Sequence, residues 1–276
     1  MLSASGQNNL YIETVRIMSR NIKILCVGDV VGASGCEFLR KKLADFKREN
    51  NIDVCIVNGE NSAVGNGMLP QSCNSIFTSG ADFITGGNHS FKRREIFEYL
   101  DSADAVIRPA NFGDGVWGKG YGIIDKGAYS VGVINLLGRV WLEGHGDPFE
   151  TAEKIIDELK KETKIIIVDF HAEATAEKKA LGYFLDGKVS AIFGTHTHIQ
   201  TSDAQVLANG TGYITDLGMT GVKDSVLGKD IEVCVHNFAD PENRLPIKDA
   251  KGECIINGIV ADIDISTRKC TAISII

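Results

Sequence analysis

The sequence predicts an α/β fold in which helices cover most of the surface of the β-sheets. Short apolar, β-branched stretches of strand length recur along the chain, and helical patterns fall between several of them. The chain has 276 residues, of which 43% are hydrophobic and 24% charged, so it can bury one large core. The predicted strands are Ile22–Val27, Val54–Val57, Asp82–Thr85, Val131–Asn135, Lys164–Val168, Ala191–Phe193 and Gly212–Thr215.

Three segments between these strands place apolar residues on one face of a helix. The first follows Gly35, the second follows the third strand, and the third follows Asp147 and Pro148, a pair typical of a helix N-cap and its first residue. The apolar positions are Phe38, Leu39, Leu43 and Phe46, then Ile96, Phe97 and Leu100, then Ile155, Ile156 and Leu159.

The pattern changes after Gly221. Segments Ile231–Val235, Glu253–Ile265 and Lys269–Ile275 predict strands joined by turns without helices between them, and therefore an antiparallel ending. Residues 1–21 lack an apolar core and predict a peripheral extension, whereas residues 22–276 contain no linker or repeat and predict a single domain.

The amino-acid composition limits which classes of binding partner are expected. The formal charge of −7 and the pI near 5.4 provide no basic field for long nucleic acid, so an anionic substrate must be met locally by metal or by a few cations. No apolar run reaches the roughly 20 residues of a membrane helix. The seven cysteines have neither C-x-x-C nor disulfide-like spacing, so we expect reduced thiols in a cytoplasmic protein.

Polar side chains follow five of the predicted strands. The carboxyl ends of the strands in an open α/β sheet face a common crevice, so these side chains are expected to lie there. Neutral imidazoles with carboxylate and amide oxygens suit manganese, iron or zinc, so the set predicts a catalytic metal site, with a structural cluster as the alternative. His145 and His236 lack this context and are interpreted as structural. The candidates are Asp29, Glu60, Asn61, Asn88, His89, His171, His196 and His198.

Details of these motifs suggest individual roles. His196 and His198 are separated by one residue, so they would point the same way from an extended backbone. Asp169 and Glu173 flank His171, and either is a candidate partner for its second nitrogen, with solvated loop carboxylates as the alternative. The basic run of residues 92–94 is a candidate phosphate contact or simply a charged helix face.

Seven motifs together resemble the YmdB-like family of calcineurin-type metallophosphoesterases. They are G-D-V-V-G, N-G-E-N, G-N-H, R-P-A-N, D-F-H-A-E-A-T, G-T-H-T-H-I-Q-T and T-D-L-G-M-T-G, in this order from about Ile22 to the C-terminus. The resemblance implies a four-layer αββα sandwich with two mixed sheets flanked by helices. It also implies a dinuclear centre, with one metal on Asp29, Glu60, Asn61 and His198, and the other on Glu60, Asn88, His171 and His196.

The first motif departs from the wider superfamily, because Val31 stands where D-x-H would place a histidine. In the YmdB-like branch Asn61 takes that place, which makes the first site richer in oxygen. We therefore expect two divalent or mixed-valence ions, iron or manganese, with zinc as the alternative.

The resemblance points to small phosphodiesters, namely 2',3'-cyclic or 3',5'-cyclic nucleotides. Two cations roughly 3.5 to 4 Å apart would acidify a bridging water to hydroxide and hold the phosphoryl oxygens. His89 is the candidate general acid, a role that the family also assigns, and a loop histidine that orients Asn88 is the alternative.

Two other classes of function stay open. A phosphomonoesterase would use the same ligands, and a regulatory nucleotide- or RNA-binding protein would keep the metals with little turnover. We also expect a homo-oligomer, since symmetric assembly is common among such enzymes.

Overall fold

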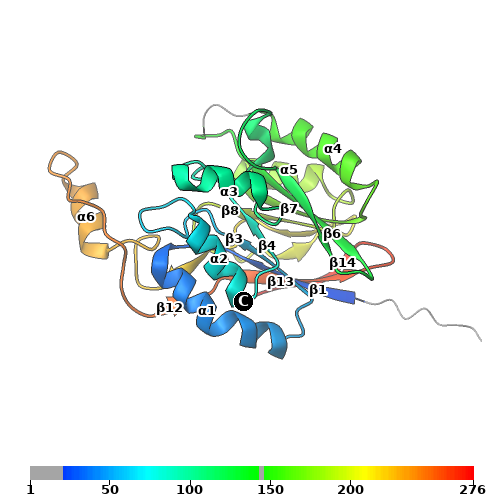
Figure 1. The fold of residues 1–276 in the computed structure, drawn as a ribbon, viewed down its shortest axis with the longest axis horizontal. Coiled ribbons are helices and arrows are strands. Elements are labelled where there is room, and N and C mark those ends of the chain that lie inside the picture. The colour runs from blue at the N-terminus through cyan, green and yellow to red at the C-terminus, as the bar shows by residue number, and fades with distance from the viewer. Residues whose placement is uncertain (1–20, 143–145) are drawn as a thin grey trace, which may run out of the picture.

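Two mixed sheets form the centre of the computed structural model, which describes residues 21–142 and 146–276 (Figure 1). The first sheet has the order β14-β13-β1-β3-β4, in which β1, β3 and β4 are parallel and β13 is antiparallel to both of its neighbours. Most of the predicted extension therefore lies outside the described residues. The bounds are β1 Asn21–Val27, β3 Val54–Asn58, β4 Phe83–Thr85, β13 Gly258–Asp264 and β14 Cys270–Ile275.

The second sheet has the order β5-β6-β7-β8-β10-β9. Its four central strands are parallel, and β5 and β9 pair antiparallel at the two edges. The bounds are β5 Tyr121–Asp125, β6 Ser130–Leu137, β7 Ile165–His171, β8 Ala191–Thr195, β9 Gln205–Val206 and β10 Gly212–Ile214. A small third sheet joins β12 Cys254–Ile255, β11 Met219–Val222 and β2 Asp29–Val30.

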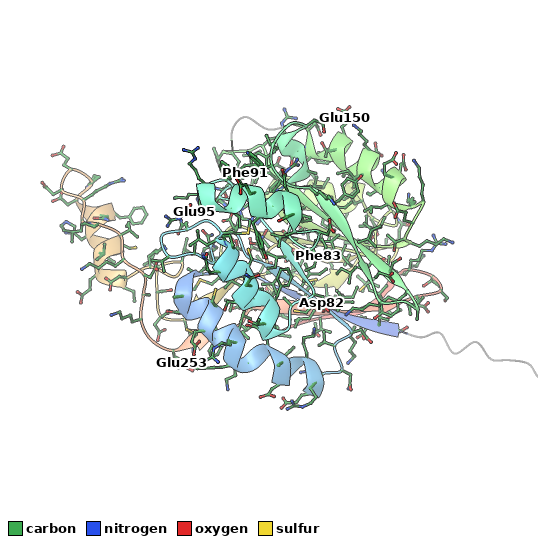
Figure 2. All side chains as sticks on the ribbon, viewed as in Figure 1. Asp82, Phe83, Phe91, Glu95, Glu150 and Glu253 are labelled. Atoms are coloured by element: carbon green, nitrogen blue, oxygen red, sulfur yellow. The ribbon has the colours of Figure 1, made fainter. Side chains whose placement is uncertain are left out.

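Side chains that alternate along each strand build three apolar layers. Along β1, Ile22, Ile24 and Cys26 face the second sheet, whereas Leu25 and Val27 face the helices. Phe83 of β4, labelled in Figure 2, is 1% exposed and belongs to the layer between the sheets. The predicted four-layer αββα sandwich is thus confirmed.

Helices α1, α2 and α3 cover the outer face of the first sheet, and α4 and α5 cover that of the second. The helix predicted after Asp147 is confirmed, since that carboxylate accepts hydrogen bonds from the backbone nitrogens of Phe149 and Glu150. The bounds are α1 Gly32–Glu49, α2 Pro70–Ser79, α3 Phe97–Ser102, α4 Pro148–Leu159 and α5 Thr175–Phe184, with short 3-10 turns at Arg94–Ile96 and Ala110–Phe112.

The strand predicted at Ile231–Val235 is wrong, because this segment begins helix α6, Ile231–Ala239. Its alternating β-branched residues suggested a strand, but the Asp230 side chain accepts a hydrogen bond from the backbone nitrogen of Val233 and caps a helix. Helix α6 stands apart from both sheets (Figure 1), so among the described residues no strand edge is beside it to pair with. The antiparallel ending is confirmed for β12, β13 and β14, which all pair antiparallel with their neighbours, and the segment predicted as Glu253–Ile265 is divided between β12 and β13.

All seven cysteines lie in the described part of the chain as free thiols, and six of them are buried. Within that same part, no helix is both long and apolar enough to cross a membrane.

Candidate metal centre

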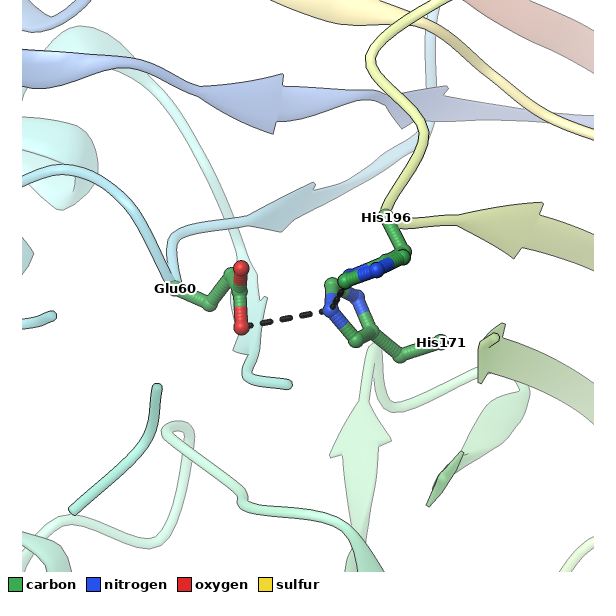
Figure 3. A group of neighbouring side chains, drawn as sticks. All are labelled: Glu60, His171 and His196. Atoms are coloured by element: carbon green, nitrogen blue, oxygen red, sulfur yellow. Dashed lines mark hydrogen bonds and ion pairs between the residues drawn. The ribbon is translucent and has the colours of Figure 1, made fainter. Parts of the chain in front are cut away.

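The carboxyl ends of the central strands bring the candidate residues to one place. Glu60 follows β3, His171 ends β7 and His196 follows β8, and Figure 3 shows their side chains turned toward one another. Their ligand atoms all lie within 4.8 Å of one another, the spacing of a group that could hold a metal ion.

His171 lies at the centre of the first cluster. Its Nε2 atom is 2.9 Å from Oδ1 of Asn88, 3.0 Å from Nδ1 of His196 and 3.3 Å from Oε2 of Glu60. The side chain of His171 is fully buried. One imidazole nitrogen therefore faces three potential ligand atoms.

A second cluster lies on the other side of Glu60. Nδ2 of Asn61 is 3.2 Å from Nε2 of His198, and it donates to Oε1 of Glu60 at 2.7 Å. Oδ1 of Asp29 is 3.8 Å from Nε2 of His198. The two carboxylate oxygens of Glu60 thus face different clusters, with Oε2 beside His171 and Oε1 beside Asn61.

Hydrogen bonds around the site determine which imidazole nitrogens of His171 and His196 carry a proton. The single Thr195 hydroxyl proton is donated to Oδ1 of Asp169 at 2.6 Å, so Oγ1 of Thr195 accepts from Nδ1 of His171 at 2.9 Å. Nε2 of His196 lies 3.0 Å from Oε2 of Glu173 and donates to it. These bonds assign the neutral tautomers in which Nε2 of His171 and Nδ1 of His196 keep free lone pairs.

The charge state of the site fits a cation. Burial lowers the pKa of His171, His196 and His198 and keeps these imidazoles neutral. Burial, followed by the charge of Glu60, raises the pKa of Asp29, whose Oδ1 is buried without a hydrogen-bond partner among the described residues. For Glu60, burial opposes ionisation, but the interactions with His171 and His89 together outweigh it and lower the pKa to about 2. A positive ion would offset the cost of these buried oxygens.

Gly87 leaves the space between the ligands open. A Cβ atom at this position would lie 2.2 Å from Oε2 of Glu60 and 2.5 Å from Nε2 of His171. Any larger residue would therefore fill the region where the two side chains converge.

The expectation of an extended backbone at the paired histidines is wrong. Strand β8 ends at Thr195, and His196 and His198 have φ angles of 99° and 63°, in the left-handed region. These turns carry the chain across the end of the sheet, and Leu227 O lies 3.2 Å from Nδ1 of His198. Both imidazoles still reach the site, each toward a different cluster.

Sequence reasoning missed Thr195. Nδ1 of His171 contacts the Thr195 hydroxyl rather than Asp169 or Glu173. Asp169 in turn accepts a hydrogen bond from that hydroxyl. Burial raises the pKa of Asp169 to about 6, although hydrogen bonds from Thr195, Thr85 and other groups oppose the shift. The available signal was the period of two along β7, which places Asp169 and His171 on the same side of the strand.

Of the two remaining histidines that the structure describes, His89 lies beside Glu60 and His236 lies on helix α6. The backbone nitrogen of His89 donates to Oε2 of Glu60 at 3.0 Å, and its Nδ1 lies 3.2 Å from Oε1 of Glu60 and 3.1 Å from Oδ1 of Asn61. His236 lies on α6, where Nε2 contacts the carbonyl of Asn243. His145 lies outside the described residues.

The four-layer fold, with imidazoles and carboxylates gathered at its strand ends, defines a protein of the metallophosphoesterase type. The chain belongs to the YmdB-like family, whose model matches residues 25–276. The resemblance found in the motifs is therefore confirmed.

Known proteins of similar sequence and structure cover nearly the whole chain. A 2',3'-cyclic-nucleotide 2'-phosphodiesterase of Bacillus subtilis (strain 168) is 43% identical over 254 residues, which cover 91% of this chain and 95% of that protein. A crystal structure described as a novel phosphatase from Mycoplasma pneumoniae has a TM-score of 0.87 at 31% identity and covers 94% of each chain. A hypothetical protein from Thermus thermophilus has a TM-score of 0.83 at 33% identity, with 92% of this chain and 98% of that chain covered.

Proposed function

We propose that the protein is a dinuclear metal-dependent phosphodiesterase that hydrolyses small phosphodiesters. Nucleoside 2',3'-cyclic phosphates are the first candidate substrates, because the Bacillus relative acts on them, and 3',5'-cyclic phosphates are the second. The observation that carries the proposal is the arrangement of two ligand clusters on either side of Glu60.

Each cluster would hold one ion, with Glu60 shared between them. The first set is Asp29, Asn61 and His198, and the second set is Asn88, His171 and His196. The first set contains two oxygen-bearing side chains besides Glu60, which favours iron or manganese over zinc. When bound, such ions acidify a water molecule and neutralise the phosphoryl oxygens.

His89 is placed to supply the proton for the leaving group. Its Nδ1 faces Glu60 and Asn61, and among the described residues its Nε2 has no hydrogen-bond partner. In hydrolysis, the bond from phosphorus to a ribose oxygen breaks as a bond to the oxygen of water forms. The departing oxygen then takes a proton from His89, which acts as general acid.

A cleft lined in part by the loops that follow Asn61 and His89 is suited to an anionic substrate. It has a volume of about 840 Å³, and its walls include four lysines and two aspartates, in contrast to the net charge of −7 for the chain. Lys92 follows His89 by three residues, and Val64 follows Asn61 by three, so the cleft begins at the loops that carry the site. Of the basic run, Lys92 lines the cleft, whereas Arg93 donates to the carbonyl oxygens of Val64 and Asn66 and holds the loop wall.

A phosphomonoesterase is the second candidate, since the structurally similar Mycoplasma protein is described as a phosphatase. The test is elemental analysis of the purified protein together with hydrolysis of 2',3'-cyclic AMP, 3',5'-cyclic AMP, bis-nitrophenyl phosphate and nitrophenyl phosphate. We expect two metal equivalents, turnover of the diesters, and loss of both properties in Glu60→Gln. Preference for nitrophenyl phosphate would favour the monoesterase, and nucleotide binding without metal-stimulated turnover would favour a regulatory protein.

A further inference from the structure

A second polar cavity lies at the amino-terminal ends of strands β7 and β8 in the six-stranded sheet. It has a volume of about 180 Å³ and is lined by Lys164 and Ser190, which directly precede β7 and β8. At the other ends of these strands, His171 is the last residue of β7 and His196 follows β8. At about 3.3 Å per residue, the length of β7 separates the cavity from the metal centre by about 20 Å.

The cavity is surrounded by positive charge. Among the residues that the structure describes, no carboxylate lines it, whereas five cationic side chains do, in a chain whose net charge is −7. Nζ of Lys188 pairs with Glu153 at 2.7 Å, but within the described part of the chain Lys160, Lys164 and Lys269 form no ion pair. The five cations are Lys160, Lys164, Lys188, Arg268 and Lys269.

Ser190 gives the cavity a buried polar group without a partner in the described chain. Its side chain is 1% exposed, and Oγ makes no hydrogen bond to any described residue. A buried hydroxyl normally has a hydrogen-bond partner, because leaving it without one lowers the stability of the folded protein. A ligand oxygen in the cavity could accept from this hydroxyl.

The backbone of two loops brings the cations over the cavity. Gly210 has a φ angle of 98°, and a Cβ atom there would lie 2.7 Å from Cδ of Lys269, so glycine allows the lysine stem to cross this loop. Arg268 has a φ angle of 65°, in the tight turn between β13 and β14. The cations thus come from separate segments that meet at one place.

We propose that this cavity binds a multiply charged phosphate anion, either inorganic diphosphate or the diphosphate of a nucleotide. The volume corresponds to about six water molecules at about 30 Å³ each, which admits a diphosphate group and leaves a nucleoside outside. Unpaired cations that repel one another gain from a shared anion. The site is separate from the metal centre and does not depend on the proposed reaction.

The experiment titrates the purified, metal-containing protein with diphosphate and, separately, with ADP by calorimetry. Lysine acylation followed by mass spectrometry then locates the bound anion. We expect diphosphate to protect Lys164 and Lys269, and the Lys164→Gln/Arg268→Gln variant to bind it at least about tenfold more weakly. A control variant, Lys41→Gln/Lys42→Gln on α1, removes the same charge elsewhere and should bind like the original protein. Equal affinities for diphosphate and ADP would assign the inorganic ligand, and tighter binding of ADP would assign the nucleotide.

Ser190→Ala separates binding from folding. Because Oγ of Ser190 has no partner among the described residues, its removal should leave the melting temperature unchanged or higher, while it weakens diphosphate binding severalfold. The proposal is overturned if neither anion protects the lysines of the cavity, or if the cavity variants and the α1 control bind equally well.

Discussion

Nε2 of His171 lies 3.0 Å from Nδ1 of His196, and neither nitrogen carries a proton in the tautomers that their other hydrogen bonds require. Two lone pairs at this distance repel each other unless a cation lies beside both. The hydroxyl of Thr195 determines this state for His171, because it accepts from Nδ1 and leaves Nε2 free.

Removal of the Thr195 hydroxyl should therefore weaken metal binding. Thr195→Val keeps the side-chain volume but leaves Nδ1 of His171 without its acceptor, and such changes typically lower metal affinity by about 10- to 100-fold. Titration with manganese after chelation measures the effect. Thr195→Ser is the matched control and should bind nearly as well as the original protein. Equal affinity in the valine variant would show that Thr195 does not orient the ligand.

Gly87→Ala should remove metal while the fold is retained. The added methyl group would lie 2.2 Å from Oε2 of Glu60, inside the region where the ligands converge. We expect metal content to fall by at least about tenfold, in line with other changes that displace ligands. Gly221→Ala, whose nearest neighbour would be Cβ of Val31 at 3.3 Å, tests the effect of a methyl group elsewhere. Full metal occupancy in Gly87→Ala would contradict the assigned site.

His89→Ala should lower turnover by about 10²- to 10⁴-fold with normal metal content, because it removes the proton donor but keeps every proposed ligand and the backbone nitrogen that donates to Glu60. Steady-state kinetics and elemental analysis of the same sample test this. A substrate with a nitrophenolate leaving group needs less protonation and should lose less activity than a cyclic nucleotide. Loss of both metals in this variant would instead place His89 among the ligands.

Asp82 should contribute stability that depends on pH. Its carboxylate accepts from Nζ of Lys47, Nζ of Lys126 and the backbone nitrogen of Cys55, at the start of β4 (Figure 2). Burial opposes its charge, but both lysines and the backbone hydrogen bond from Cys55 together outweigh burial and lower the pKa. The contribution is therefore complete above the unfolded pKa of about 3.9 and is lost as pH falls through the folded pKa.

The variant Asp82→Asn tests that contribution. We expect the free energy of unfolding at pH 7 to fall by about 1 kcal/mol, after allowance for solvent screening of partly exposed lysines. The difference from the original protein should shrink below about pH 4. Urea unfolding at several pH values measures it, with the exposed Asp45→Asn as control. A difference that stays constant down to pH 2 would rule out the charge of Asp82 as its cause.

Most of the strands could be predicted from the sequence. A run of β-branched residues followed by polar residues is a pattern that a short stretch of sequence shows by itself. The strand that ends near Val27 and the one that ends at His171 follow this rule. The segment at Ile231 does not, since local alternation cannot reveal whether a sheet edge lies beside it. In that case the cap at Asp230 determines the structure.

The residues of the candidate site could be proposed from the sequence, but the hydrogen bonds that orient them could not. Thr195 is an ordinary β-strand residue in sequence, and its role arises only where β7 and β8 pair His171 with Thr195. Likewise, the left-handed backbone at His196 and His198 depends on the turn that follows β8. Contacts of this kind depend on sheet register, which a single sequence does not specify.

The most direct test of the account is anomalous diffraction from crystals of the metal-containing protein. Data on either side of the iron and manganese absorption edges locate each ion. The account predicts two peaks roughly 3.5 to 4 Å apart, one on each side of the Glu60 carboxylate. A single peak bound only by His171 and His196, or no peak near Asp29 and His198, would contradict it.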